Sequence, residues 1–450
     1  RVDLAPLSVD DSADLLASLE LDALDLARWA PQIWQQVGGH PAFLLESVKL
    51  LLSTTPGLAP AVLPLPAGIG AVVQRRVALL STHARRLAAL AAVAGSSYSS
   101  ALAAATLACS PADLAAPLQE LAQRQVFQGR RFVHDVIAST IGQQLPADEA
   151  AALHRLVAAH LAAHQGDPAR TALHWLAAGA WQAAGDAFRQ AARAARDAAL
   201  ANAHAALLDQ AIAAYEHEPG CHDALFDTLA ERAGAYESQG HEGLRPQLVA
   251  RLQALARTEV QQLVAMNHHC GWLTNLARPV DEAAVRAAID RAMVVGRPDL
   301  SWQLSRMLAW QWAMSNRADE GLALIDRHQG WVEREASLNT RAEWRLARAN
   351  IFAYGDRLPE AIAEARQAMA ASIAAGDWPE ALPAMSNLGV MHYWRGEYED
   401  AHAVLSQARA QRERLYGGSG SGIKIDIHLG AVLYEMGRSD EAAAMLGGAV

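Results

Sequence analysis

The 450-residue sequence has little cysteine, almost no lysine and few aromatic residues, and each shortage excludes a class of structure. The cysteines Cys109, Cys221 and Cys270 form no Cys-x-x-Cys pair, which argues against a disulfide framework and a cysteine-rich zinc site. An aromatic share of only 6% argues against a β-sandwich or barrel. The only lysines, Lys49 and Lys424, do not follow glycine, so the Gly-Lys-Ser/Thr signature of a P-loop is absent. We therefore expect no enzymatic activity in this chain itself.

Charge of either sign is also sparse, at 19% of residues, while 52% of residues are apolar. So many apolar side chains offset the entropy lost on folding, which excludes a disordered chain. The net charge of −10 gives no general attraction to nucleic acid or anionic lipid. No apolar run reaches the roughly 18 residues of a membrane span, so we expect no membrane segment and a cytoplasmic location. Because the chain begins at Arg1-Val2-Asp3, we expect it to be cut from a longer protein.

Helix-forming alanine is abundant, and the first segment, residues 1–64, has the pattern of three or four short helices. Ser8, followed by Asp11 three residues later, is a capping signal for the first of them. Gly39 is predicted to end one helix and Pro41 to begin the next. The segment is therefore expected to be a small helical region.

A second segment, residues 65–146, follows a proline-rich linker at 56–66. A short hairpin is predicted over 126–133, and one more helix begins near Asp135. Helical runs are predicted at 68–80, at 82–94 and, after the cap Ser110, at 111–124. Helices followed by a hairpin and another helix suggest a winged-helix domain.

This second segment is the basic part of the sequence, with seven arginines against three acids. Such arginines can bind DNA phosphates. Arg85 and Arg86, however, lie beside an apolar helix face, which favours packing inside the protein. We therefore expect DNA contact only through a domain outside this chain.

From residue 147 to residue 450 the sequence repeats itself with a period of about 40 residues. Equivalent positions 308, 348, 388 and 429 are separated by 40, 40 and 41 residues. In each unit a small residue lies at the same later position, namely Gly321, Ala361, Ala401 and Ala442. Tetratricopeptide repeats place small residues in this way, which lets two antiparallel helices approach closely. The sequence thus predicts an all-α chain ending in an α-solenoid of about seven helical hairpins.

Two short motifs lie about ninety residues apart, on either side of the basic helices. One is Gly38-Gly39-His40-Pro41-Ala42-Phe43-Leu44-Leu45-Glu46, and the other is Phe132-Val133-His134-Asp135-Val136-Ile137. Together they resemble the lid and winged-helix motifs of the STAND class of signalling NTPases. In particular, they are similar to bacterial AAA ATPase-containing regulators with helical repeat sensors, including large LuxR-type transcription activators.

The resemblance implies that three residues contact nucleotide. In that family the Gly-x-Pro element approaches the adenine, and the winged-helix histidine contacts the β-phosphate of ADP. These roles fall on Gly39 with Pro41, and on His134. A helix that begins directly after His134 suits this role, because helix N-termini attract phosphate. ADP or ATP is the implied cofactor, held by a partial site, since the α/β core of such regulators is missing from this chain.

The resemblance also implies a regulatory function. The repeat array would bind a protein or small-molecule inducer, which would favour opening, nucleotide exchange and self-association. The array is expected to be truncated at its C-terminal end. Two alternatives remain open: a plain repeat scaffold for a protein partner, and the regulatory region of a nucleotide cyclase.

Four tryptophans of the array, Trp302, Trp310, Trp312 and Trp344, are predicted on neighbouring first helices of the hairpins. First helices line the concave side of such arrays, so these aromatics could anchor a ligand or partner. The alternative is packing between repeats.

The run Asn267-His268-His269-Cys270 carries potential metal ligands. Adjacent residues on a helix point about 100° apart, so these side chains cannot all face one ion. We therefore assign no metal site, and no catalytic residue is assigned either.

Overall fold

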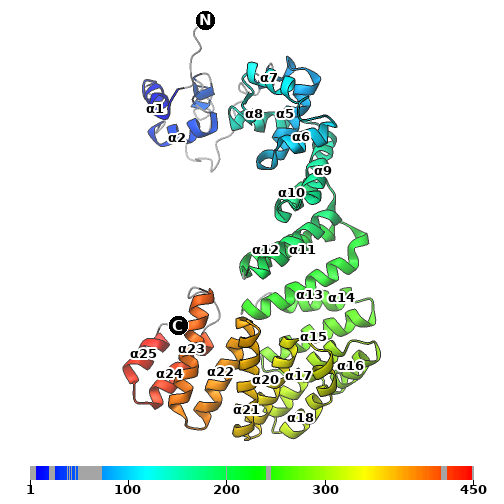
Figure 1. Cartoon of the computed structure of the whole chain (residues 1–450), viewed down its shortest axis with the longest axis vertical. Coiled ribbons are helices and arrows are strands. Elements are labelled where there is room, and N and C mark those ends of the chain that lie inside the picture. The colour runs from blue at the N-terminus through cyan, green and yellow to red at the C-terminus, as the bar shows by residue number, and fades with distance from the viewer. Residues whose placement is uncertain are drawn as a thin grey trace. The chain divides into compact units, whose positions relative to one another are not determined.

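The computed structural model describes residues 7–19, 26–37, 39, 41, 43–45, 47–48, 73–74, 76–198, 200–239, 245–416 and 423–447 (Figure 1). Over these ranges the chain is helical apart from one two-stranded antiparallel sheet and the connecting turns. The all-α prediction is therefore confirmed. The expected linker at 56–66 and a glycine-serine insert at 417–422 lie outside the described residues. The chain divides into two compact units: residues 1–198 with 213–219, called the N-terminal unit below, and residues 199–212 with 220–450, called the array unit.

The N-terminal unit contains most of the short elements. They are α1 (Val9–Ala17), α2 (Leu26–Val37), α5 (Thr82–Ala94), the 3-10 turn η1 (Gly95–Ser97), α6 (Ser100–Leu107), α7 (Ala115–Gln123), β1 (Phe127–Gln128), β2 (Arg131–Phe132), α8 (Asp135–Gln144), α9 (Ala147–Ala163), α10 (Pro168–Ala177) and α11 (Trp181–Asp197).

The array unit consists of longer helices in sequence, and α12 has residues in both units. The elements are α12 (Ala201–Glu216), η2 (Pro219–Cys221), α13 (His222–Gln239), α14 (Arg245–Leu255), α15 (Glu259–Asn275), α16 (Glu282–Val294), α17 (Pro298–Met314), α18 (Ala318–Asp326), α19 (Gln329–Arg334), α20 (Leu338–Tyr354), α21 (Leu358–Ala374), α22 (Trp378–Trp394), α23 (Tyr398–Tyr416), α24 (Ile423–Glu435) and α25 (Ser439–Gly447).

The predicted helix start at Ser8 is confirmed. The Ser8 hydroxyl accepts a hydrogen bond from the Asp11 amide at 3.0 Å, and the Asp11 carboxylate accepts one from the Ser8 amide at 3.3 Å. These reciprocal bonds satisfy two amides that the first helical turn leaves without acceptors. The Ser8 hydroxyl also donates to the Asp11 carboxylate at 2.7 Å, and this bond, with the one from the Ser8 amide, holds the pKa of Asp11 below its usual value.

The predicted helix start at Pro111 is wrong. Ser110 and Asp113 do exchange the expected side-chain bonds, but α7 begins only at Ala115. In the intervening stretch the Asp113 amide donates to the Ser110 carbonyl oxygen and the Ala115 amide to that of Ala112. These bonds join residues three apart, as in turns, and not four apart, as in an α-helix. The cap motif therefore closes a turn here.

One continuous core holds the N-terminal unit together. It takes buried side chains from Leu16 on α1, Leu90 on α5 and Phe127 on β1, and it extends to Val157 on α9. The expected end of the second segment at residue 146 is therefore not a break in packing. The hairpin predicted over 126–133 is present, with Phe127 paired to Phe132.

The array unit contains four successive hairpins with the predicted period: α17–α18, α20–α21, α22–α23 and α24–α25. Each turn has one residue with positive φ, two positions before the second helix begins. These residues are Asn316, Asp356, Gly396 and Gly437, with φ of 61°, 57°, 76° and 76°. The recurrence of one backbone conformation at one repeat position explains the regular hairpin geometry.

Small residues lie where the two helices of a hairpin touch, as predicted. A Cβ atom added to Gly389 on α22 would lie 2.5 Å from Cγ of Leu405 on α23, closer than packed carbon atoms come. One added to Gly321 on α18 would lie 2.9 Å from the Ala309 carbonyl oxygen. Ala361, Ala401 and Ala442 are buried at the equivalent position. The abundance of alanine therefore has a structural cause.

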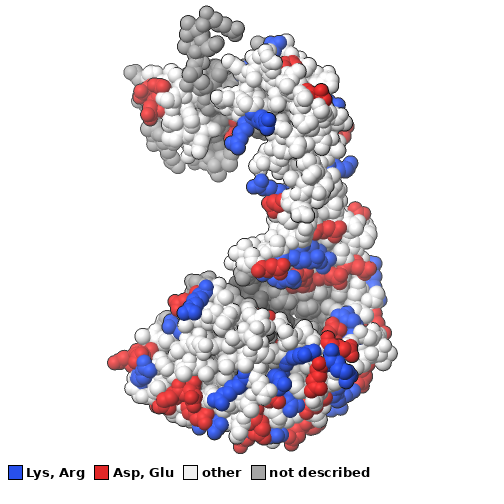
Figure 2. All heavy atoms as spheres, in the orientation of Figure 1, with Lys and Arg blue, Asp and Glu red and all other residues white. Residues whose placement is uncertain are grey.

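Charge is distributed unevenly between the two units. In the view of Figure 2, acidic and basic side chains are closely interspersed over the array unit and sparse over the N-terminal unit. Among the described residues, no helix is both long and apolar enough to cross a membrane.

Candidate functional site

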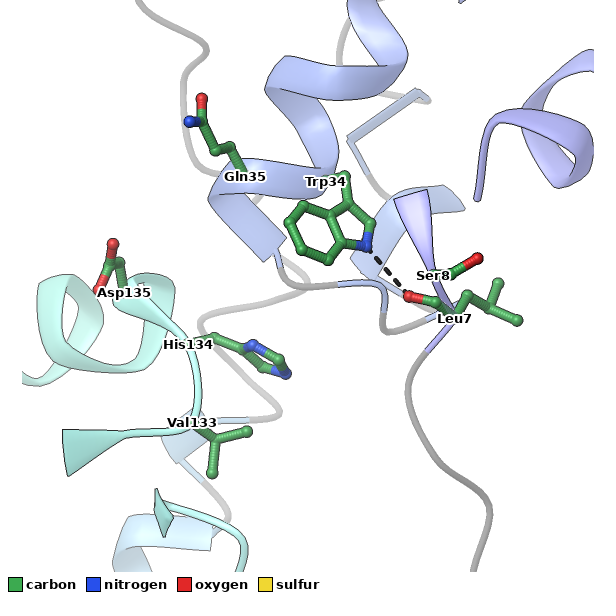
Figure 3. A pocket seen from close by; sticks show the side chains of 7 residues that line it. All are labelled: Leu7, Ser8, Trp34, Gln35, Val133, His134 and Asp135. Carbon is green, nitrogen blue, oxygen red and sulfur yellow. Dashed lines mark hydrogen bonds between the residues drawn. The ribbon is translucent and has the colours of Figure 1, made fainter. Parts of the chain in front are cut away.

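A cavity of about 460 Å³ opens in the N-terminal unit. It brings together the start of α1, the second half of α2 and the junction between β2 and α8 (Figure 3). Its lining residues are Leu7, Ser8, Trp34, Gln35, Val133, His134 and Asp135. Two stretches of sequence about a hundred residues apart therefore share one pocket.

The wall formed by α1 and α2 is fixed by a small hydrogen-bond network. The Trp34 indole Nε1 donates to the Leu7 carbonyl oxygen at 3.0 Å, and the Leu7 amide donates to the Gly39 carbonyl oxygen at 2.9 Å. Gly39 has a φ of +72°, and any Cβ there would collide with the Leu7 carbonyl oxygen. Only glycine satisfies both conditions, so Gly39 positions the wall and does not itself line the cavity.

The opposite wall is the start of α8. His134 precedes the helix in an extended conformation, its carbonyl oxygen accepts from the Ile137 amide, and its side chain does not cap the helix. Figure 3 shows the imidazole directed across the cavity toward Leu7. Asp135, the first helical residue, is exposed at the rim. Helix N-terminal amides and an imidazole thus lie on one side of the pocket.

The three residues assigned to nucleotide contact occupy different places. His134 lines the cavity, Gly39 lies directly behind its wall, and Pro41 is exposed and is not a lining residue. The sequence did not single out Trp34 or Gln35 for this site. The only signal at Trp34 was apolar helical spacing, which does not distinguish a cavity wall from a core, and Gln35 gave no signal.

Two of the seven arginines of the basic segment form hydrogen bonds within the fold, and four others are exposed. Arg85 donates to the carbonyl oxygens of Ala78 and Leu80, at 3.3 and 3.1 Å, and Arg76 donates to that of Gln125 at 3.4 Å. These bonds support the interpretation that the segment packs internally. Arg75 lies outside the described residues.

Three of the four tryptophans proposed as a ligand surface are core residues. Trp302, Trp312 and Trp344 are buried, and only Trp310 is partly exposed. Trp344 donates through Nε1 to the Ile325 carbonyl oxygen at 3.3 Å, and Trp302 packs edge-on against His328. Burial between successive hairpins therefore corrects the expectation of a four-tryptophan surface.

Trp312 is held by charged neighbours. Its Nε1 donates to Glu282 at 3.0 Å, and the guanidinium groups of Arg286 and Arg317 each lie 4.6 Å from its ring centre. Hydrogen bonds from Arg317 lower the pKa of Glu282 to about 2. The chain thus stacks cations on its own aromatic rings.

His268, His269 and Cys270 lie on α15, where burial raises the pKa of the Cys270 thiol to about 11. Over the described parts of the chain, the one trio with ligand atoms close enough for a metal ion is His392, Glu397 and Asp400. Two of the three residues already pair with each other, because His392 Nδ1 lies 2.6 Å from the Glu397 carboxylate.

Two comparisons with known proteins give no match: no protein-family model and no curated protein matches this sequence. Among solved structures, one similar chain is the Signal Transduction ATPase with Numerous Domains (STAND) protein with a tetratricopeptide repeat sensor, PH0952, from Pyrococcus horikoshii. That match covers 99% of this chain and 72% of the other, with a TM-score of 0.50 and 12% identity. Another, BtubC (BKLC) from P. vanneervenii, covers 55% of this chain and 89% of that one, with a TM-score of 0.33 and 18% identity.

The likeness to the Pyrococcus protein concerns the fold. This chain shares the helical fold of that protein, with helical hairpins repeated along the chain. The second match is too weak to support any argument.

Proposed function

We propose that this chain is the regulatory part of a STAND-type signal-transduction ATPase, in which the cavity binds ADP and the repeat array binds a partner or inducer. One observation supports this most directly. The cavity is lined by His134 and backed by Gly39, two of the three positions that the family resemblance assigns to nucleotide.

The lining suits a nucleoside diphosphate. At the start of α8 the Ile137 amide already donates to the His134 carbonyl oxygen, while the amides of Asp135 and Val136 have no acceptor within the helix. Together with the His134 imidazole they form a wall that attracts phosphate. Leu7, Val133 and the Trp34 ring supply apolar surface for a base or ribose. The volume of about 460 Å³ lies within the range of small-molecule pockets. The exposed Asp135 carboxylate repels further negative charge, which favours ADP over ATP.

In this proposal side chains from both walls of the cavity hold the nucleotide between them. The His134 imidazole donates a hydrogen bond to a phosphate oxygen, and the wall held by Trp34 and Gly39 positions the other end of the nucleotide. ADP supplies the diphosphate that connects the two walls. Binding of a partner to the array would favour opening and self-association, with transcriptional output through another domain.

The test is ADP binding to this chain, followed through the imidazole NMR signals of His134. We expect saturable ADP binding that shifts those signals, and a loss of affinity of about tenfold in His134→Ala, the size of one charge-assisted hydrogen bond. His83→Ala, which removes an exposed histidine on α5, serves as the matched control and should bind ADP normally. No saturable binding, or equal affinity in His134→Ala, would refute the nucleotide part and leave a plain repeat scaffold.

A further inference from the structure

Large apolar side chains recur on the surface of the array unit near the end of the first helix of each hairpin. Met314, Tyr354, Trp394 and Tyr434 follow one another at intervals of 40 residues, at or next to the ends of α17, α20, α22 and α24. Their exposed fractions are 52%, 40%, 47% and 65%. With Trp310, one helical turn before Met314, they form the set that we call the aromatic ladder.

Neighbouring rings of the ladder touch one another. The ring centres of Trp310 and Tyr354 are 4.9 Å apart at 81°, and those of Tyr354 and Trp394 are 5.8 Å apart at 84°. These are edge-to-face contacts between successive hairpins. The three rings therefore form a continuous strip across α17, α20 and α22.

Packing within the repeats does not require these residues. Leu308, Phe352, Met391 and Leu433 already fill the core positions near the ends of the same four helices. In a chain with only 6% aromatic residues, three exposed aromatics near the ends of consecutive first helices need another explanation. Large exposed apolar patches mark interaction surfaces.

The turns beside the ladder are acidic. Six exposed carboxylates there have no hydrogen-bond or ion-pair partner among the described residues, and each follows the ladder residue of its own hairpin within six positions. They are Asp319, Asp356, Glu399, Asp400, Glu435 and Asp440. Where the structure describes these turns, every arginine is already paired: Arg317 with Glu282 and Glu320, Arg357 with Glu360, Arg395 with Glu397, and Arg438 with Glu441.

We infer that the aromatic ladder is a docking surface for an extended, arginine-bearing segment of a partner protein. Guanidinium groups would stack on the exposed rings and pair with the available carboxylates. The chain already makes such contacts internally, since Arg348 lies 4.8 Å from the Trp344 ring centre and Arg357 4.4 Å from that of Phe352. This inference names the partner of the array and in that respect rests on the proposed function.

The probe is a fluorescein-labelled nine-residue peptide of alternating arginine and glycine, titrated at about 0.15 M salt to screen long-range attraction. A peptide with citrulline in place of each arginine keeps the shape and removes the charge. The test variant is the triple substitution Tyr354→Ser, Trp394→Ser and Tyr434→Ser. The matched control, Met293→Ser with Val294→Ser, removes exposed apolar side chains away from the ladder.

We expect saturable binding of the arginine peptide, at least tenfold weaker binding of the citrulline peptide, and at least tenfold weaker binding by the ladder variant but not by the control. No saturable binding, equal binding of the citrulline peptide, or equal loss in both variants would overturn the inference. If the ladder variant instead changes the sedimentation of the chain alone, the occupant is a second copy, and the inference also fails. Binding of ADP is measured on the other unit, so failure of the cavity proposal is recognised separately.

Discussion

The two units differ in how far apart in the sequence their packing partners lie. In the N-terminal unit one core joins Leu16 to Val157. In the array unit the helices contact those of the same or the next hairpin, as α20 contacts α21 and α22. The first unit therefore shares its stability among distant segments, whereas each hairpin of the second depends on its neighbours.

This difference matters for the sites. The cavity exists only because α1, α2 and α8 are held by a common core. A core substitution far from the cavity should therefore disrupt it. The aromatic ladder is formed by the helix ends of successive hairpins, so a local substitution should remove one of its residues at a time. The following predictions test that distinction, beginning with the largest expected effect.

Phe127→Ala should destabilise the whole N-terminal unit. Phe127 is fully buried and packs edge-on against Tyr98 and Phe132, so its truncation should cost about 3–5 kcal/mol. Hydrogen exchange should then accelerate together in α1, α5 and α9, with no change in the array unit. Acceleration confined to the hairpin would contradict a shared core. Leu79→Ala, at an exposed position, is the control.

Gly389→Val should destabilise the array locally, by about 1–3 kcal/mol, because its side chain would overlap Leu405. Hydrogen exchange should accelerate in α22, α23 and the adjacent hairpins and remain unchanged in α13 and α14. Gly234→Ala on α13, where an added Cβ meets nothing within 4 Å, should be neutral or slightly stabilising. A uniform loss across the array would show that it unfolds as one body.

Ser8→Ala should cost about 1 kcal/mol by removing the cap of α1. Because Ser8 and Leu7 line the cavity, fraying of α1 should also weaken ADP binding. Ser99→Ala, which removes the cap of α6 away from the cavity, should cost a similar amount without affecting ADP. Thermal unfolding and ADP titration of both variants provide the measurement. An equal loss of ADP affinity in the two variants would argue against a local role of the α1 cap in the cavity.

Acid should weaken each unit through its own buried histidine, with no effect at neutral pH. Burial lowers the pKa of His174 to about 4, as it does for His328 in the array unit. In the unfolded chain each histidine has its ordinary pKa of 6.5 and therefore binds a proton at a higher pH than in the folded chain. Folding stability is therefore lost as the pH falls from 6.5 toward 4. His174→Asn should reduce this loss in the N-terminal unit alone, and His328→Asn in the array unit alone. The pH dependence of hydrogen exchange in each unit checks this, and a cross-effect would show that the units are coupled.

Much of the local structure could be predicted from the sequence. The cap at Ser8, the start of α8 at Asp135 and the hairpin each depend on a few adjacent residues, and the structure confirms them. The failure at Ser110 shows the limit of such signals. The same side-chain bonds close a turn or begin a helix, and the surrounding packing selects between them.

The site was less predictable. Spacing placed four tryptophans on neighbouring first helices, yet three are buried and Trp310 alone remains in a surface strip. Tyr354 and Trp394 were not singled out, although their interval of 40 residues is visible in the sequence. A repeat period gives equivalent positions, but it does not say which of them face solvent.

By itself the sequence determined the helical class, the period of the array and the small residues within its hairpins, because these follow from propensity and spacing over short windows. Only the tertiary structure decided that Trp34 and His134 line one cavity and that Tyr354 and Trp394 remain exposed. Burial and contact depend on segments that are distant along the chain, and no local pattern records which of them will meet.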